Sequence, residues 1–164
     1  MKRFSVADAA AMDTLGMRLG HALEGGAVVY LNGELGAGKT TLVRGVLRGL
    51  GFSGRVRSPT YTLVEAYDIA DRRLYHLDLY RIRGPAELEY LGIRELDLPD
   101  LWVFVEWPER GEGRLPAPDL VLSFELLEAG RRISLAAASA RGRDLEAAWQ
   151  ASTEIAQAGL AMLD

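Results

Sequence analysis

The sequence predicts an α/β fold: a three-layer sandwich with a mostly parallel central sheet, antiparallel additions and a C-terminal helix. Residues 101–105 form a continuous apolar run, which is typical of a strand buried on both faces of a parallel sheet. Two strand-like runs, 120–126 and 132–136, flank a short polar turn and indicate an antiparallel hairpin. The 164 residues contain no repeat, low-complexity tract or linker. We therefore expect one domain over residues 1–164.

The N-terminal third is expected to contain a helix, a strand and a second helix. Ser5 with Asp8 caps the first helix, which ends at Gly25 and Gly26. Its apolar positions at helical spacing are Met12, Leu15, Leu19 and Leu23. A strand over residues 27–31 follows, and the second helix spans residues 40–50 up to Gly51. Arg44 and Arg48 share one face of that helix, a spacing most typical of a solvated surface.

The rest of the chain adds strands, a short helix and a helical tail. Strands over residues 61–69 and 73–80 are separated by a turn, and Pro85 and Gly92 bracket a short helix over 86–91. A proline- and glycine-rich loop covers residues 108–118. The tail, residues 141–164, is predicted to be helical and has no assigned role. Its apolar side of small and hydrophobic residues comprises Leu145, Ala148, Trp149, Ser152, Ile155, Ala156, Leu160 and Leu163.

Composition narrows the class of protein. About half of the residues are apolar, which favours a globular domain over a disordered chain. The chain has no cysteine, and this excludes disulfides, thiolate metal sites and cysteine nucleophiles. The net charge of −4 argues against a free-standing nucleic-acid clamp. With neither a signal-peptide core nor an apolar run of membrane-spanning length, we expect a soluble, cytoplasmic protein without a membrane partner.

Residues 33–40 read Gly-Glu-Leu-Gly-Ala-Gly-Lys-Thr, a complete G-x-x-x-x-G-K-[ST] phosphate-binding loop. The predicted strand before it and the predicted helix after it supply the context that the motif requires. Lys39 is expected to reach the β- and γ-phosphates, and the Thr40 hydroxyl to bind Mg²⁺. The chain has 17 arginines and only two lysines, so a lysine at this position is distinctive. We therefore expect the chain to bind a nucleoside triphosphate.

Hydrolysis also needs carboxylates, and position singles out two. Glu106 directly follows the apolar run 101–105, where an acid lies at the carboxyl edge of the sheet; the other interpretation is a strand-end partner for an arginine. Asp78 shares a strand face with Leu74, His76 and Tyr80, and sequence alone leaves it equally open as a water-exposed strand residue. We expect His76 to be a structural histidine.

Two further features allow more than one interpretation. Residues 58–62, Ser-Pro-Thr-Tyr-Thr, follow the second helix, where many nucleotide hydrolases sense the γ-phosphate; a proline turn before a strand fits equally well. Trp107 follows Glu106, and it either stacks on a ligand or partner or covers the edge of the sheet.

Four sequence blocks together resemble the TsaE family, also known as YjeE. They are residues 33–40, SPTYTLVE at 58–65, HLDLYR at 76–81 and VEWPE at 105–109, with ELEYLGI at 87–93 between the last two. The resemblance covers residues 5 to 136, and the later three blocks make it specific.

The resemblance implies an ATPase subunit that acts in adding threonylcarbamoyl to the adenosine beside the anticodon of tRNAs reading codons that begin with A. It implies a complex with the transferase and its partner subunit, of the TsaD and TsaB type, with tRNA met only through that complex. In the family, lysine and threonine at the positions of Lys39 and Thr40 bind phosphate and Mg²⁺. The acid at Glu106 contributes to the metal site, and the aspartate at Asp78 is needed for hydrolysis.

The resemblance also implies the set of nucleotide-binding residues. Lys39, Asp78 and Glu106 form the implied catalytic set, and Thr40 and Glu106 the metal pair. The implied nucleotide-binding residues are Gly33, Glu34, Leu35, Gly36, Ala37, Gly38, Lys39, Thr40, Thr41, Gly130 and Arg131. Family members often carry a threonine near Met12, so base contacts are left unassigned there.

Three other functions are compatible with a phosphate loop. A small-molecule kinase would need an arginine-bearing lid, which Arg110 and Arg114 could supply, but few residues are left for an acceptor domain. A GTPase is disfavoured because the chain lacks an Asn-Lys-x-Asp motif. A nucleotide-gated binding subunit, whose hydrolysis resets a partner, overlaps with the ATPase hypothesis.

Overall fold

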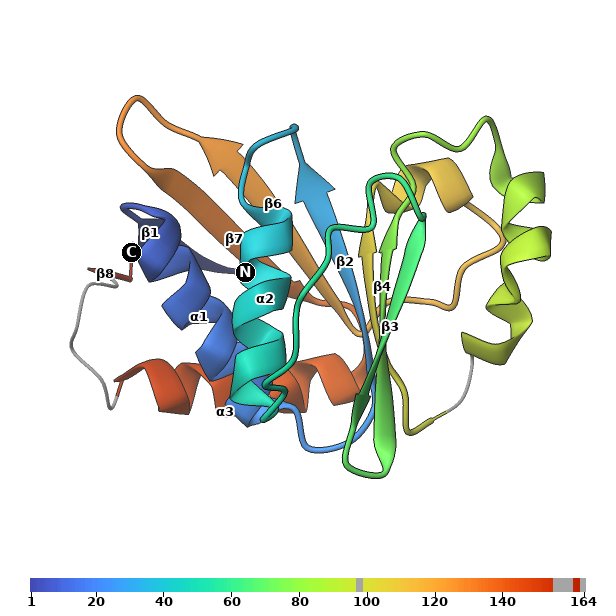
Figure 1. Cartoon of the computed structure of the whole chain (residues 1–164). Helices are drawn as coiled ribbons and strands as arrows, with labels where there is room; N and C mark the ends of the chain where they lie inside the picture. The colour runs from blue at the N-terminus through green and yellow to red at the C-terminus, as the bar shows by residue number, and fades with distance from the viewer. Residues whose placement is uncertain (97–98, 155–160, 163–164) are drawn as a thin grey trace.

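A computed structural model describes residues 1–96, 99–154 and 161–162. Its described residues form an eight-stranded sheet in the order β3-β4-β5-β2-β6-β7-β1-β8 (Figure 1). The four strands β4, β5, β2 and β6 run parallel to one another, and antiparallel strands extend the sheet on both sides. The strands are β1 Lys2–Val6, β2 Ala27–Gly33, β3 Val64–Ile69, β4 Arg72–Asp78, β5 Trp102–Glu106, β6 Leu120–Leu126, β7 Arg131–Ala137 and β8 Ala161–Met162.

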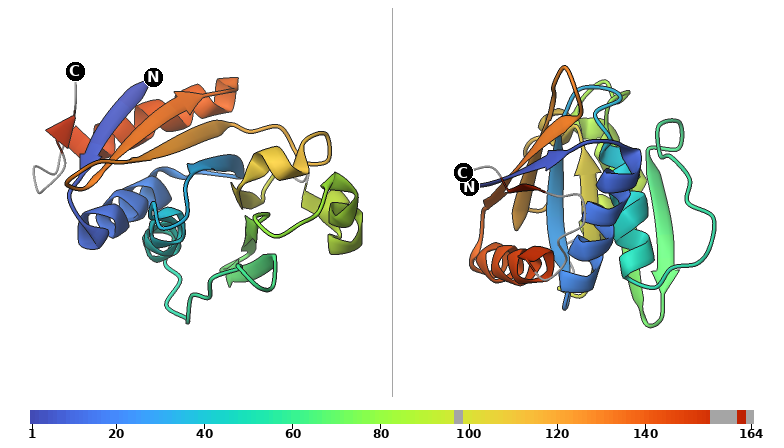
Figure 2. Two further views of the ribbon diagram at one scale, coloured as in Figure 1. Left: turned by 90° about the horizontal axis from the view of Figure 1, so that it is seen from above. Right: turned by 90° about the vertical axis from the view of Figure 1, so that its left-hand side faces the viewer.

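The two faces of the sheet are covered differently (Figures 1 and 2). Residues of the α-helices α1 (Ala9–Ala22), α2 (Lys39–Gly49) and α3 (Ala140–Glu154) pack into one core. The 3₁₀ helices η1 (Pro85–Leu91), η2 (Ile93–Leu96) and η3 (Pro108–Gly111) lie over the second core. In β5, Trp102 and Phe104 point into the first core, and Val103 and Val105 into the second. The predicted α/β class is confirmed, with 3₁₀ turns in place of α-helices in the third layer.

Glycines allow α1 and α2 to pack backbone against backbone. A Cβ atom built on Gly16 would lie 2.2 Å from the Leu42 carbonyl oxygen, and one on Gly45 would lie 2.1 Å from the Asp13 carbonyl oxygen. Gly20 and Gly49 repeat this contact one turn further along. An ion pair between Asp13 and Arg48 joins the same two helices, so Arg48 is exposed but also has an ion-pair partner. This crossing fixes α2, the helix that follows the phosphate loop.

The N-terminus corrects one prediction, because Ser5, which was expected to cap the first helix together with Asp8, lies within strand β1 (Lys2–Val6). Ser5 pairs with Arg132 of β7 and caps nothing. Asp8 alone caps α1, where its Oδ1 atom accepts a hydrogen bond of 2.8 Å from the Ala11 amide. The helix ends at Ala22, before the predicted Gly25. Pairing with β7 is a long-range contact, which local spacing does not reveal.

The strands after α2 also start and end differently from the prediction. Strand β3 begins at Val64, because residues 61–63 form a turn in which Leu63 has φ 66°. Strand β4 ends at Asp78, two residues before Tyr80. Pro85 and Gly92 bracket η1 as predicted, with Gly92 in the left-handed region, but the turn is a 3₁₀ helix. The β6–β7 hairpin is present as predicted.

The tail is part of the fold. Helix α3 begins at Ala140, and it buries Leu145 and Trp149, with the Trp149 ring 5.2 Å from that of Phe4. The predicted continuous helix is wrong at its end, because Ala161–Met162 form β8 and pair with β1. Ile155, Ala156, Leu160 and Leu163 lie outside the described residues. Within the described part of the chain, no helix combines the length and apolarity needed to cross a membrane.

Candidate functional site

The phosphate-binding loop joins the carboxyl end of β2 to the N-terminus of α2. Gly36 has φ 76° and Gly38 has φ 103°, conformations that L side chains rarely adopt, so the loop backbone requires glycine at these positions. Gly38 also sits against Met12, since a Cβ atom there would lie 3.0 Å from the Met12 Cε. The result is a turn of backbone amides that leads into a helix N-terminus, an arrangement suited to an anion.

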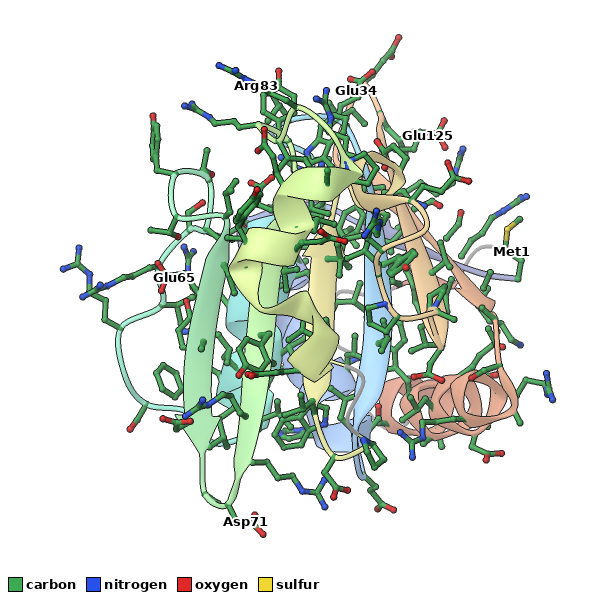
Figure 3. The ribbon with its side chains drawn as sticks, turned by 90° about the vertical axis from the view of Figure 1, so that its right-hand side faces the viewer. Met1, Glu34, Glu65, Asp71, Arg83 and Glu125 are labelled. Carbon is green, nitrogen blue, oxygen red and sulfur yellow. The ribbon has the colours of Figure 1, made fainter. Side chains whose placement is uncertain are left out.

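A pocket of about 260 Å³ lies over this loop. Its lining comes from the phosphate loop, the start of α1, the loop before β3, the ends of β4 and β5, and β7. The lining residues are Ala9, Met12, Leu35, Gly36, Ala37, Gly38, Lys39, Thr40, Thr41, Thr60, Asp78, Glu106 and Arg131. Three of the sequence-predicted residues, Gly33, Glu34 and Gly130, do not line it. Figure 3 shows Glu34 at the end of the sheet that carries the pocket, with Asp71 at the opposite end.

Lys39 is buried, with 4% of its surface exposed. Its Nζ atom donates to the carbonyl oxygens of Gly33 and Glu34, the latter at 3.2 Å, and lies 4.3 Å from the centre of the Trp107 ring. Burial lowers the pKa of Lys39, and the negative charges of Glu106 and Asp78 oppose this shift. The ammonium therefore sits folded back beside the loop, above an aromatic face that favours a cation.

Glu106 ends β5 beside Thr40, the first residue after Lys39 in α2. The Thr40 Oγ1 atom donates a hydrogen bond of 2.9 Å to the Glu106 Oε1 atom, and His76 Nε2 lies 2.8 Å from the same oxygen. Burial raises the pKa of Glu106, but the hydrogen bonds from His76 and Thr40 and the positive charge of Lys39 outweigh it and hold that pKa below its ordinary value. Glu106 is thus an ionised carboxylate at the base of the pocket.

Asp78 ends β4 and is placed opposite Glu106 in the parallel register of β4 and β5. It is buried, so the alternative of a water-exposed strand residue is wrong. The Tyr80 amide donates to its Oδ1 atom at 3.0 Å, and Thr60 Oγ1 lies 3.4 Å from its Oδ2 atom. Burial raises the pKa of Asp78, and the charge of Glu106 adds to this effect.

The loop before β3 is tied down at two points. The Tyr67 hydroxyl accepts from the Arg57 amide at 2.9 Å and donates to the Arg57 carbonyl at 3.0 Å. Further along, the Ser58 and Thr60 hydroxyls are hydrogen-bonded at 2.7 Å. This holds Thr60 at the pocket, the position that the γ-phosphate-sensing interpretation of the sequence requires.

Arg131 reaches the phosphate loop from the start of β7. Its Nη2 atom donates to the Gly36 carbonyl oxygen at 3.2 Å. The neighbouring Gly130, at φ 81°, turns the chain, and a Cβ atom there would lie 2.5 Å from the Val6 carbonyl oxygen. Gly130 is therefore needed for the turn, and it does not itself line the pocket.

Neither Trp107 nor the two candidate lid arginines line the pocket. The Trp107 ring lies 5.0 Å from the Tyr80 ring, so it covers the edge of the sheet as well as facing Lys39. Arg110 stacks over Tyr80 at 5.2 Å, and Arg114 forms an ion pair with Glu89. Both arginines have partners within the chain.

Sequence reasoning missed some contacts of the site. Neither the pairing of His76 with Glu106 nor the contact of Thr60 with Asp78 is visible without the order of the strands. Ala9 was missed as well, because a small residue at a helix start carries no chemical signal. The alternation of side chains along β4 did indicate part of this arrangement, since it places His76 and Asp78 on the same face of the strand.

Comparisons with known proteins agree with this geometry. Residues 6–133 match the family model for "Threonylcarbamoyl adenosine biosynthesis protein TsaE". The tRNA threonylcarbamoyladenosine biosynthesis protein TsaE of Haemophilus influenzae is 48% identical over 122 residues, covering 74% of this chain and 77% of that protein. The protein of the same name from Synechocystis is 45% identical over 111 residues, covering 65% and 70%. The crystal structure of Bacillus subtilis YdiB matches with a TM-score of 0.75 at 25% identity, over 93% of this chain and 98% of that one.

Proposed function

This chain belongs to the TsaE family of threonylcarbamoyl adenosine biosynthesis proteins, and on that basis we propose that it binds and hydrolyses ATP as a subunit of the tRNA-modifying assembly. The transferase and its partner subunit, of the TsaD and TsaB type, would complete that assembly in the cytoplasm. A chain of net charge −4 would meet tRNA only through those partners. The observation that carries the proposal is the convergence of Lys39, Thr40, Asp78 and Glu106 around the pocket over the phosphate loop.

The residues at the pocket suit Mg²⁺ bound together with a nucleotide. Among the described residues, no group of three histidine, aspartate or glutamate side chains could hold a metal by itself. Mg²⁺ commonly takes one or two protein oxygens and completes its shell with water and substrate phosphates. The Thr40 hydroxyl and the ionised Glu106 carboxylate would supply those protein oxygens. The Thr40 Oγ1 atom lies 2.9 Å from the Glu106 Oε1 atom. Bound between these residues and a nucleotide, the metal would supply positive charge that offsets the charge of the phosphates.

The protein groups around the phosphates have separable roles. The amides of residues 34–39 and the N-terminus of α2 would bind the phosphate chain. Lys39, which reaches its present acceptors through flexible methylene groups, would turn from the Gly33 and Glu34 carbonyls to the phosphates. Asp78 would orient the attacking water and accept its proton, because a buried carboxylate of raised pKa is a better base than an exposed one.

The edge of the pocket supports action with a partner. Leu35, within the phosphate loop, is 59% exposed, and Tyr61, on the neighbouring loop, is 81% exposed. Large apolar side chains exposed next to a site are typical of an interaction surface. A partner that binds there would cover the pocket and exclude water from it.

Replacement of Lys39 tests the proposal. Lys39→Ala should reduce ATP turnover by about 10²- to 10³-fold or more, as the loss of one preorganised charge-stabilising donor does, and should weaken ATP binding measured by calorimetry. Lys2→Ala is the matched control, because Lys2 is the other lysine of the chain and does not line the pocket. Unchanged affinity and turnover in Lys39→Ala would refute the proposal. Phosphate transfer to a nucleoside acceptor in place of water would favour the kinase alternative.

A further inference from the structure

His76 is buried completely, with 0% of its surface exposed, and it does not line the pocket. It lies on β4, two residues before Asp78, and the parallel register places it beside β5. Its Nε2 atom lies 2.8 Å from the Glu106 Oε1 atom. Among the described residues, its Nδ1 atom is buried and has no hydrogen-bond partner.

These contacts assign the proton of the imidazole ring. An ionised carboxylate only accepts hydrogen bonds, so Nε2 must carry the hydrogen that Glu106 receives. In a neutral ring this leaves Nδ1 as a bare acceptor, whereas the other tautomer would turn the lone pair of Nε2 toward the carboxylate and leave a buried, unpaired Nδ1–H donor. A histidine kept only for packing gains nothing here, since an apolar side chain of similar size would fill the space without a buried, unpartnered nitrogen.

Both hydrogen bonds to Glu106 end on the same oxygen. Thr40 Oγ1 and His76 Nε2 reach Oε1 from α2 and from β4. Within the described residues, the Oε2 atom receives no hydrogen bond, which leaves it available to a ligand in the pocket. When Thr40 turns its hydroxyl oxygen toward a cation, His76 remains as the donor that fixes the carboxylate.

We propose that His76 is a positioning residue, which fixes the rotation of the Glu106 carboxylate so that its other oxygen meets Mg²⁺ beside Thr40. The inference rests on the proposed function, because it assumes that Glu106 and Thr40 bind the metal of an ATP complex. It assigns His76 no contact with nucleotide or metal. Partners that orient a metal-binding group typically contribute 10- to 100-fold to metal affinity.

Three variants separate positioning from packing. His76→Gln places an amide nitrogen close to the position of Nε2 and keeps a donor toward Glu106. His76→Asn is also polar but reaches only the position of Nδ1, and His76→Leu fills the space without a donor. For each, we would measure Mn²⁺ binding by electron paramagnetic resonance in the presence of a non-hydrolysable ATP analogue. Affinity for that analogue without metal and thermal unfolding would be measured in parallel.

The expected result is a Mn²⁺ dissociation constant raised about 10- to 100-fold in His76→Leu and His76→Asn, with metal-free analogue affinity unchanged. His76→Gln should stay close to the wild type. Wild-type Mn²⁺ affinity in His76→Leu, or the same weakening in His76→Gln as in His76→Asn, would overturn the inference and leave the proposed function standing. If the wild-type chain binds the analogue without any metal dependence, the metal part of the proposed function fails first and this inference fails with it.

Discussion

Asp78 and Glu106 end neighbouring strands, yet their surroundings shift their pKa values in opposite directions. Burial raises the pKa of Asp78, whereas for Glu106 the hydrogen bonds from His76 and Thr40 and the positive charge of Lys39 outweigh burial and lower the pKa. Neighbouring carboxyl groups whose pKa values are shifted in opposite directions commonly have different chemical roles in a site. Glu106 is suited to staying charged beside a cation, and Asp78 to taking up a proton.

Asp78→Asn should separate hydrolysis from binding. Loss of a general base or a water-positioning group typically reduces the rate by about 10²–10⁴-fold, whereas the proposed binding of ATP by the phosphate loop, Lys39 and Thr40 should be retained. Single-turnover hydrolysis and calorimetric ATP affinity would measure the two effects. Asp68→Asn is the control, because Asp68 lies on the adjacent β3 in an exposed ion pair. An affinity for ATP that falls in proportion to the rate would make Asp78 a binding or structural residue.

The stability difference between Asp78→Asn and the wild type should also depend on pH. Because folding raises the pKa of Asp78, the protonated form stabilises the fold, and this contribution is lost as pH rises through the folded-state pKa. Asp78→Asn should therefore be more stable than the wild type at neutral pH. The difference should disappear as pH falls below 3.8, the ordinary aspartate value. Urea unfolding between acid and neutral pH measures it, and a less stable variant at pH 7 would show that Asp78 is stabilised by its charge.

At the scale of elements, the crossing of α1 and α2 holds the phosphate loop in place. Four glycines, two on each helix, let the backbones approach until added Cβ atoms would overlap carbonyl oxygens of the facing helix. Met12 of α1 lines the pocket and Gly38 lies against it, so the helix contact continues into the site. A change in the separation of α1 and α2 should therefore change the affinity of the pocket for a nucleotide.

Gly45→Ala tests this coupling. Overpacking of a close contact typically costs about 1–3 kcal/mol, although alanine favours an isolated helix by about 1 kcal/mol over glycine. A net loss of stability with weaker ATP binding would therefore arise from the helix contact. Arg44→Ala, exposed on the same helix, should change stability by less than about 0.5 kcal/mol. A Gly45→Ala protein as stable as the wild type, with unchanged affinity, would show that the crossing can relax.

Local pattern predicted those elements whose signal is contained in their own residues. The phosphate loop, the buried strand β5 and the β6–β7 hairpin are of this kind. Strands β1 and β8 were missed because each pairs with a strand far away in the sequence. Likewise, Asp78 and Glu106 could be chosen as edge carboxylates, but the link from His76 to Glu106 depends on β4 lying next to β5. Strand order is the information that spacing along the chain lacks.

At the scale of the whole molecule, helix α3 of the C-terminal tail completes the hydrophobic core, whereas the edge of the pocket is left uncovered. Trp149 of α3 is completely buried against Phe4 of β1, which gives the tail a structural part in the fold. In contrast, Leu35 and Tyr61 expose apolar surface beside the pocket. Arg131, the arginine that lines the pocket, is hydrogen-bonded to the Gly36 carbonyl. Because Arg131 is already hydrogen-bonded within the chain and the edge of the pocket is uncovered, we expect the isolated chain to hydrolyse ATP slowly.

The most direct test of the central claim is the rate of ATP hydrolysis by this chain as the transferase and its partner subunit are added. The account predicts slow turnover by the isolated chain and saturable stimulation by the two partners together. Both rates should be lost in Lys39→Ala and retained in Lys2→Ala. Hydrolysis at several per second without partners, or a stimulated rate that survives Lys39→Ala, would contradict the claim that this site is a partner-dependent ATPase.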